Sequence, residues 1–71
     1  MKQLSEGDLV YVPSSVRLTR KDKAGATIDY VVLRKPYNLL VVGVDEASFE
    51  VLYDRKKWSV EKKKTYGVKN D

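Results

Sequence analysis

Short runs of Val, Tyr, Leu, Ile and Thr, separated by turn-forming residues, are the feature of this sequence that most restricts its fold. No segment of useful length places apolar residues at the spacing of an amphipathic helix. Alternation of apolar and polar residues over short runs is typical of β-strands, in which successive side chains point to opposite faces. The sequence therefore predicts an all-β protein.

The length of the chain sets how much structure these runs can build. Its 71 residues suffice for one compact core but not for two. We therefore expect one domain over residues 1–71, with flexible ends at 1–6 and 69–71. Because no apolar run follows Lys2, we expect no signal peptide, no membrane contact and a cytoplasmic location.

The N-terminal half of the chain predicts one strand and one long exposed excursion. Residues 9–12 form the strand, which Pro13 ends because proline lacks the amide donor that a ladder needs. After this break, Val16 and Leu18 continue the alternation of apolar residues. The polar, basic segment 19–27 then predicts a mobile excursion, from which the chain returns extended over 28–32.

The C-terminal half predicts a meander and a short closing strand. The run 37–44 is apolar on both faces, so we expect it to be the central and most buried strand, with a bulge at Gly43. Further elements are expected at residues 49–53, 57–60, 61–64 (a 3₁₀ turn) and 65–68. Alternation on adjacent runs predicts a core of Val10, Val12, Leu39, Val41, Val51 and Val60.

The order of these runs resembles the SH3-like small barrel over nearly the whole chain. The likeness rests on Gly-Asp-Leu-Val-Tyr-Val at 7–12, the 38–44 and 49–53 runs, Trp58-Ser59-Val60 and Tyr66-Gly67-Val68. The chain is similar to short SH3-like proteins of unassigned function that tailed bacteriophages encode, and more distantly to Tudor-type and KOW-type barrels. This resemblance implies a single five-stranded barrel with a basic excursion after the first strand. It also implies a binding module, which in a phage-encoded protein acts in the host cell.

Aromatic side chains are the first candidates for a binding surface, because five tyrosines and one tryptophan are many for one small barrel. In SH3 domains such rings line a peptide groove. Since the excursion is basic and Trp58 stands alone, we do not expect a proline-rich ligand. The alternative is that Tyr53, Trp58 and Tyr66 cap the core with their polar tips in water. The candidate protein-binding residues are Tyr11, Tyr30, Tyr37, Tyr53 and Tyr66.

Basic residues are the second candidates, because Lys and Arg outnumber Asp and Glu by 14 to 10. Two basic turns flank the run that holds Trp58, and a third cluster lies in the excursion. We predict that both turns lie at one rim and contact phosphates, while an exposed Trp58 ring stacks on an unpaired base. The alternative is a solvated face that keeps a β-protein soluble. The candidate nucleic-acid-binding residues are Arg17, Arg20, Arg55, Lys56, Lys57, Trp58, Lys62, Lys63 and Lys64.

Catalysis and metal binding have little support in this composition. The chain has no Cys and no His, which excludes disulfides, zinc sites built on those residues and His-based catalysis. The carboxylates of residues 45–54 lack calcium-loop spacing, so we expect surface charge, with no cofactor, no metal and no enzymatic activity.

Two classes of function stay open on these grounds. One is a nucleic-acid-associated module, and the other is a protein-docking adaptor or a modulator of a host or virion protein. The expected partner is therefore a nucleic acid or a larger protein, and the chain itself is expected to be a monomer or a weak oligomer.

Overall fold

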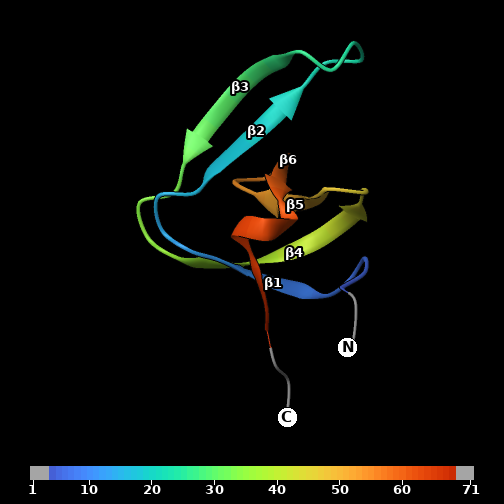
Figure 1. Cartoon of the computed structure of the whole chain (residues 1–71). Helices are drawn as coiled ribbons and strands as arrows, with labels where there is room; N and C mark the ends of the chain where they lie inside the picture. Colours follow the sequence, from blue (N-terminus) through green and yellow to red (C-terminus); the bar gives the residue numbers. More distant parts are fainter. Residues whose placement is uncertain (1–3, 69–71) are drawn as a thin grey trace.

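The computed structural model describes residues 4–68 and confirms the all-β prediction. Figure 1 shows the strands as one twisted sheet, from which one hairpin projects. The strand order is β3-β2-β6-β5-β4-β1-β7, and every paired neighbour is antiparallel. The elements are β1 (Leu9–Val12), β2 (Arg17–Lys21), β3 (Thr27–Val32), β4 (Tyr37–Val44), β5 (Ser48–Tyr53), β6 (Lys56–Glu61), the 3₁₀ helix η1 (Lys62–Lys64) and β7 (Tyr66–Gly67). No helix among the described residues has the length and apolar character needed to cross a bilayer.

The predicted five-stranded barrel differs from this structure in strand number and in closure. Residues 4–68 form seven strands, and the edge strands β3 and β7 do not pair with each other, so the sheet stays open. The additional strands come from the excursion, whose two arms pair from Arg17↔Val32 to Lys21↔Thr27 as the β2–β3 hairpin. The expected exposure of segment 19–27 is confirmed for residues 21–27, whereas Thr19 and Arg20 are half-buried.

The core lies on one face of the coiled sheet, called here the core face. All six predicted core residues are buried. Phe49 and Trp58 join them because they alternate in register with Val51 and Val60 on β5 and β6. The hairpin contributes Leu18 from β2, and Leu33 follows directly after β3. The complete core is Val10, Val12, Leu18, Leu33, Leu39, Val41, Phe49, Val51, Trp58 and Val60.

The opposite face of the sheet, called here the outer face, is in contact with solvent. The prediction that residues 37–44 are buried on both faces is therefore wrong: Leu40 on the outer face is 38% exposed. Val44, which lies opposite Phe49 at the end of the strand, is 48% exposed. The middle strand of the sheet is β5 rather than β4. A strand with apolar residues on both faces is fully buried only when a second layer covers each face. In residues 4–68 no such layer covers the outer face.

Two connections in the meander follow from local sequence. The predicted bulge is confirmed, because the register of β4 against β5 shifts between Val41 and Gly43. Between β5 and β6, Asp54 and Arg55 have φ values of 51° and 63°. Two successive positive φ values define the type I′ turn, whose twist matches that of the strands it joins. Arg55 occupies a position that glycine usually takes.

Residues before β1 form a turn that is attached to the sheet. The Ser5 amide donates to Asp8 Oδ2 at 2.9 Å, and the Gly7 amide donates to the Val41 carbonyl at 2.9 Å. Leu4 packs against the core. Residues 4–6 of the predicted flexible end thus belong to an ordered turn, whereas 1–3 and 69–71 lie outside the described residues.

Candidate nucleic-acid interface

A compact turn at the tip of the β2–β3 hairpin allows its two strands to pair. The Asp22 carboxylate accepts hydrogen bonds from the amides of Ala24 and Ala26, at 2.9 and 3.0 Å. Gly25 has φ +87° and donates its amide to the Asp22 carbonyl at 3.0 Å. Asp side chains commonly close turns in this way, and glycine adopts positive φ without steric cost. The basic segment is therefore held as an extended arm.

Alternation along β2 divides its side chains between the two faces of the sheet. Leu18 enters the core, and Arg20 lies on the same face. Arg17, Thr19 and Lys21 point to the outer face, toward the ends of β5 and β6. A single register pair, Thr19↔Ser59, joins β2 to β6. Because the two strands pair only there, they diverge on either side of that point.

A groove lies on the outer face where β2 and β6 diverge. Its volume is about 810 Å³. Three cationic side chains and one carboxylate line it, together with five hydroxyl side chains. The lining residues are Ser15, Arg17, Thr19, Lys21, Thr27, Val32, Ala47, Ser48, Ser59, Glu61 and Lys64.

The charges in this groove come from two distant parts of the sequence. Arg17 and Lys21 belong to the hairpin, and Lys64 belongs to η1 on the other side. Lys64 Nζ lies 3.7 Å from Glu61 Oε1, and Lys63 Nζ lies 3.4 Å from Glu61 Oε2. Glu61 is thus shared by two lysines, which leaves the groove with an excess of positive charge.

An exposed aromatic ring stands beside the groove. Tyr30 is 59% exposed and lies opposite Thr19 on the same face of the hairpin. The Arg17 guanidinium carbon lies 4.9 Å from the centre of the Tyr30 ring. At this distance a cation is attracted to the face of the ring. Arg17 therefore links the groove to an accessible aromatic surface.

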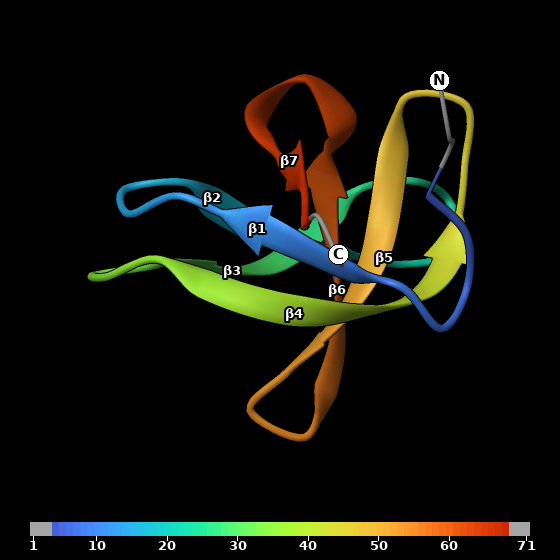
Figure 2. The same ribbon diagram turned by 90° about the horizontal axis from the view of Figure 1, so that it is seen from below.

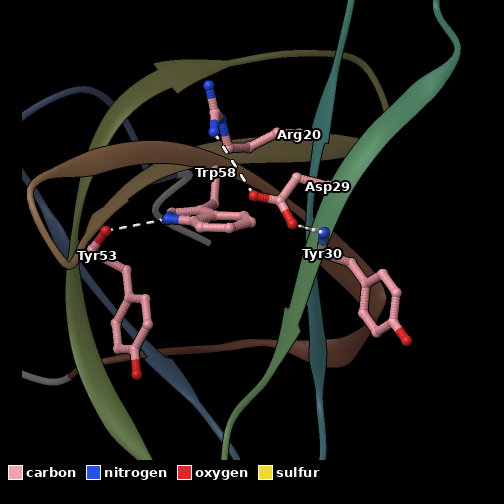
Figure 3. Close-up of polar contacts among 5 residues, drawn as sticks. All are labelled: Arg20, Asp29, Tyr30, Tyr53 and Trp58. Atoms are coloured by element: carbon pink, nitrogen blue, oxygen red, sulfur yellow. Dashed lines mark hydrogen bonds and ion pairs between the residues drawn. The ribbon is translucent and has the colours of Figure 1, made fainter.

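Trp58 does not provide the exposed ring that the sequence predicted. It is only 5% exposed, and its indole Nε1 donates to the Tyr53 carbonyl at 2.9 Å. The Arg20 guanidinium carbon lies 5.7 Å from its ring centre, and Arg20 pairs with Asp29 at 3.6 Å. Figure 3 shows Trp58 between Tyr53 on one side and the Arg20–Asp29 pair on the other. Its position is structural, and this ring is not accessible to a base.

The two basic turns around β6 lie at opposite ends of the strand. Figure 2 shows the β5–β6 turn and η1 on opposite sides of the molecule. A strand rises about 3.3 Å per residue, so the six residues of β6 separate the turns by roughly 20 Å. The prediction of a common rim is therefore wrong, because an intervening strand separates its two ends. Arg55, Lys56 and Lys57 lie away from the groove, whereas Arg17 and Lys64 line it.

The five candidate tyrosines lie in three separate places rather than along one groove. Tyr11 and Tyr66 face each other across β1 and β7, with ring centres 6.2 Å apart. Tyr37 and Tyr53 pack edge to face at 5.3 Å and partly cover the core. Tyr30 stands on the hairpin. The predicted capping of the core thus holds for Tyr53 alone. Trp58 lies inside the core with its indole N–H bonded to a backbone carbonyl, and Tyr66 is 61% exposed.

A row of leucines crosses the outer face at some distance from the groove. Leu9 on β1, Leu40 on β4 and Leu52 on β5 are opposite one another in register. Their exposed fractions are 42%, 38% and 41%. We call these three residues the leucine row. Lys57 on β6 extends it at one end.

The sequence interpretation missed the role of Lys21, Thr19 and Ser59 as groove residues. The signal was present in the period-two pattern of Arg17, Thr19 and Lys21, which continues the strand through residues assigned to a loop. No carboxylate cluster replaces the groove as a site, since residues 4–68 contain no group of three His, Cys, Asp or Glu placed to hold a metal ion.

Comparisons with protein-family models, with curated proteins and with solved structures find no match for this chain.

Proposed function

We propose that this chain is a non-catalytic module that binds single-stranded nucleic acid along the outer-face groove. The observation that carries the proposal is the groove itself, with Arg17, Lys21 and Lys64 converging on it beside the exposed ring of Tyr30. The SH3-like resemblance of the sequence belongs to the same proposal, because folds of that kind are used more for binding than for chemistry.

The lining chemistry suits a phosphate backbone. Arg and Lys neutralise phosphates, and Ser and Thr hydroxyls donate hydrogen bonds to phosphate oxygens. Tyr30 offers a flat surface on which an unpaired base stacks for about 1–3 kcal/mol. Since the groove contains few apolar side chains, it favours a polar, anionic strand over an apolar peptide.

The test is a titration of fluorescently labelled single-stranded DNA and RNA into the full chain at several salt concentrations. Contacts with three phosphates predict a log–log salt slope of roughly −2 on a single strand. The variant Arg17→Glu/Lys21→Glu should weaken binding by about tenfold or more and bring the slope toward roughly −0.7.

A matched control separates the groove from net charge. Arg55→Glu/Lys56→Glu makes the same change in charge at the far end of β6, outside the groove. We expect its affinity to stay close to that of the wild type at moderate salt. Equal losses in the two double variants would show that net charge alone drives binding, and absence of binding at low salt would refute the proposal.

A second candidate function, docking to a larger protein, is favoured by the leucine row. Three adjacent leucines on one face give a continuous apolar strip, and Lys57 at its end suits a partner whose apolar strip has an acidic border. Leu40→Ser interrupts the strip without touching the groove. Loss of a partner complex in this variant, with unchanged nucleic-acid binding, would favour docking.

A further inference from the structure

The two edges of the sheet differ in how open they are to another strand. β7 has two residues, whereas β3 has six and forms the other edge among the described residues. The β3 sequence, Thr-Ile-Asp-Tyr-Val-Val, contains no Lys, Arg or Pro, the residues that commonly protect an edge. Ile28, Tyr30 and Val32 on it are 58%, 59% and 44% exposed. This edge therefore has the composition of a strand that accepts a partner.

The hydrogen bonds determine which backbone groups of β3 face outward. The Leu33 amide donates to the Val16 carbonyl at 3.1 Å, in line with the register of β2 and β3. In an antiparallel pair every second residue bonds to the neighbouring strand. The backbone amide and carbonyl of Val31 therefore point toward β2, and those of Tyr30 and Val32 point to the free edge.

One of these outward amides is already occupied. The Tyr30 amide donates to Asp29 Oδ1 at 2.8 Å, and Asp29 Oδ2 lies 3.6 Å from Arg20. Figure 3 shows the Asp29 carboxylate between the Tyr30 amide and the Arg20 guanidinium. A carbonyl from another strand must displace this carboxylate before it can accept the same hydrogen bond.

We propose that the free edge of β3 pairs with β3 of a second copy of this chain, antiparallel about Val31, and that Asp29 holds the edge closed in the monomer. In this register Tyr30 lies opposite Val32 of the second copy, and Val32 lies opposite its Tyr30. The outward amides and carbonyls of both residues then bond across the two copies.

The strand is complementary to itself in this register. The two Tyr30–Val32 pairs each join an aromatic to a β-branched side chain, a combination that stabilises antiparallel sheets, and Val31 faces Val31 of the second copy between them. The two Asp29 residues are four positions apart along the pairing, or about 13 Å, so their charges do not meet. Side chains opposite each other in a sheet share a face, so the two outer-face grooves would lie on one surface. This last consequence rests on the proposed function, whereas the pairing itself does not.

The experiment is sedimentation equilibrium of the full chain without nucleic acid, at up to about 1 mM protein. We expect weak dimerisation of the wild type and, for Asp29→Ala, dimerisation about tenfold tighter, because the Tyr30 amide no longer has a side-chain acceptor within its own chain. Asp29→Asn keeps an acceptor oxygen and should stay close to the wild type. If Asn associated as tightly as Ala, the guarding role of the Asp29 hydrogen bond would be overturned.

A second pair of variants, made in the Asp29→Ala background, tests the edge. Val32→Pro removes one outward donor while leaving the ladder to β2 intact, and Val32→Thr keeps the donor in a side chain of similar shape. Proline should abolish dimerisation, and threonine should preserve it. Independently of these variants, exchange of the Val32 amide in the Asp29→Ala chain should slow as protein concentration rises.

Three results would overturn the proposal. One is the observation that the wild type and the Asp29→Ala variant both stay monomeric at the highest concentration. The partner of the edge would then be an extended segment of another protein. Another is equal dimerisation of the Pro and Thr variants, which would place the contact elsewhere, for example on the leucine row. The third is a Val32 amide whose exchange does not depend on concentration.

Discussion

The four-strand body of β1, β4, β5 and β6 and the β2–β3 hairpin are stabilised in different ways. Strands of the body pair over four or more residues each and supply eight of the ten core residues. The hairpin is joined to the body by one register pair, Thr19↔Ser59. It supplies only Leu18 to the core, and Leu33 directly after β3 adds one more residue. Side-chain anchoring therefore replaces main-chain pairing at this junction.

This difference separates the stable part of the molecule from the part that carries the candidate interfaces. The hairpin presents Arg17, Lys21 and Tyr30 on one face and the open edge of β3 at its side. Segments with few buried apolar contacts open most readily, and binding surfaces are often found in them. A hairpin fixed by a few side chains fits such a role.

The largest expected effect comes from removing the anchor of the hairpin. Leu18 is fully buried, so Leu18→Ala should lower the free energy of unfolding by about 3 kcal/mol. A chain of this size has a total stability of roughly 3–5 kcal/mol. Urea denaturation measures the loss, and amide exchange should show β2 and β3 losing more protection than β5. Thr27→Ala, on the exposed face, is the control, and equal loss of protection in hairpin and body would contradict the comparison.

A substitution in the body should act on the whole molecule at once. Val51 is fully buried on the middle strand, and Val51→Ala should cost about 2 kcal/mol. Here we expect protection to fall in parallel over β1, β4, β5 and β6 and in the hairpin. A melting curve unchanged by this substitution would contradict the contribution of Val51 to the stability of the core.

Arg20 should contribute a smaller part of the junction. Its guanidinium covers Trp58 and pairs with Asp29, and both contacts are partly exposed. Arg20→Ala should therefore destabilise the chain by about 1 kcal/mol. Tryptophan fluorescence of the folded variant should shift toward that of a hydrated indole. Retention of the wild-type spectrum would mean that Arg20 does not cover the ring.

One substitution in the β5–β6 turn of the body is expected to stabilise the chain. Arg55 has φ 63° in the β5–β6 turn, a value that glycine adopts without strain, so Arg55→Gly should add about 0.5–1 kcal/mol of stability. Arg55→Ala removes the same guanidinium but keeps the strain, and should not stabilise. Thermal denaturation compares the two variants, and an equal gain in both would attribute the effect to charge.

The smallest effect concerns proton binding by Tyr53. The pKa of Tyr53 is raised above its ordinary value of 10.0. The largest cause is a side-chain hydrogen bond with Tyr37. Desolvation and the negative charges of ionised Tyr37 and Asp54 raise the pKa further. A raised pKa in the folded state stabilises the fold below pH 10.0, and this stabilisation is lost as pH rises through the raised value. Tyr37→Phe should lower the pKa of Tyr53, which an absorbance titration of tyrosinate measures. Tyr11→Phe, at a different site, should leave it unchanged.

The fold and the site differ in how much of them was predictable. Local signals were sufficient for the Gly43 bulge, the meander and the six predicted core residues, because each depends on alternation or on turn chemistry within a few positions. The extended return over 28–32 was predicted, but the strand through residues 19–21 and its pairing with β3 were missed, because charged residues in a strand pattern also indicate a loop. The turn that Asp22 closes decides between strand and loop, because it brings the two arms together.

The sequence by itself determined that this chain is all-β, which face of most strands is buried, and that its basic residues cluster around Arg17 and Lys64. Only the tertiary structure decided that these two residues line one groove, that Arg20 covers Trp58, and that β3 is left as an open edge. The physical reason is range. Side-chain alternation is set by neighbouring residues, whereas a groove or an edge depends on which distant strands pair and where that pairing stops.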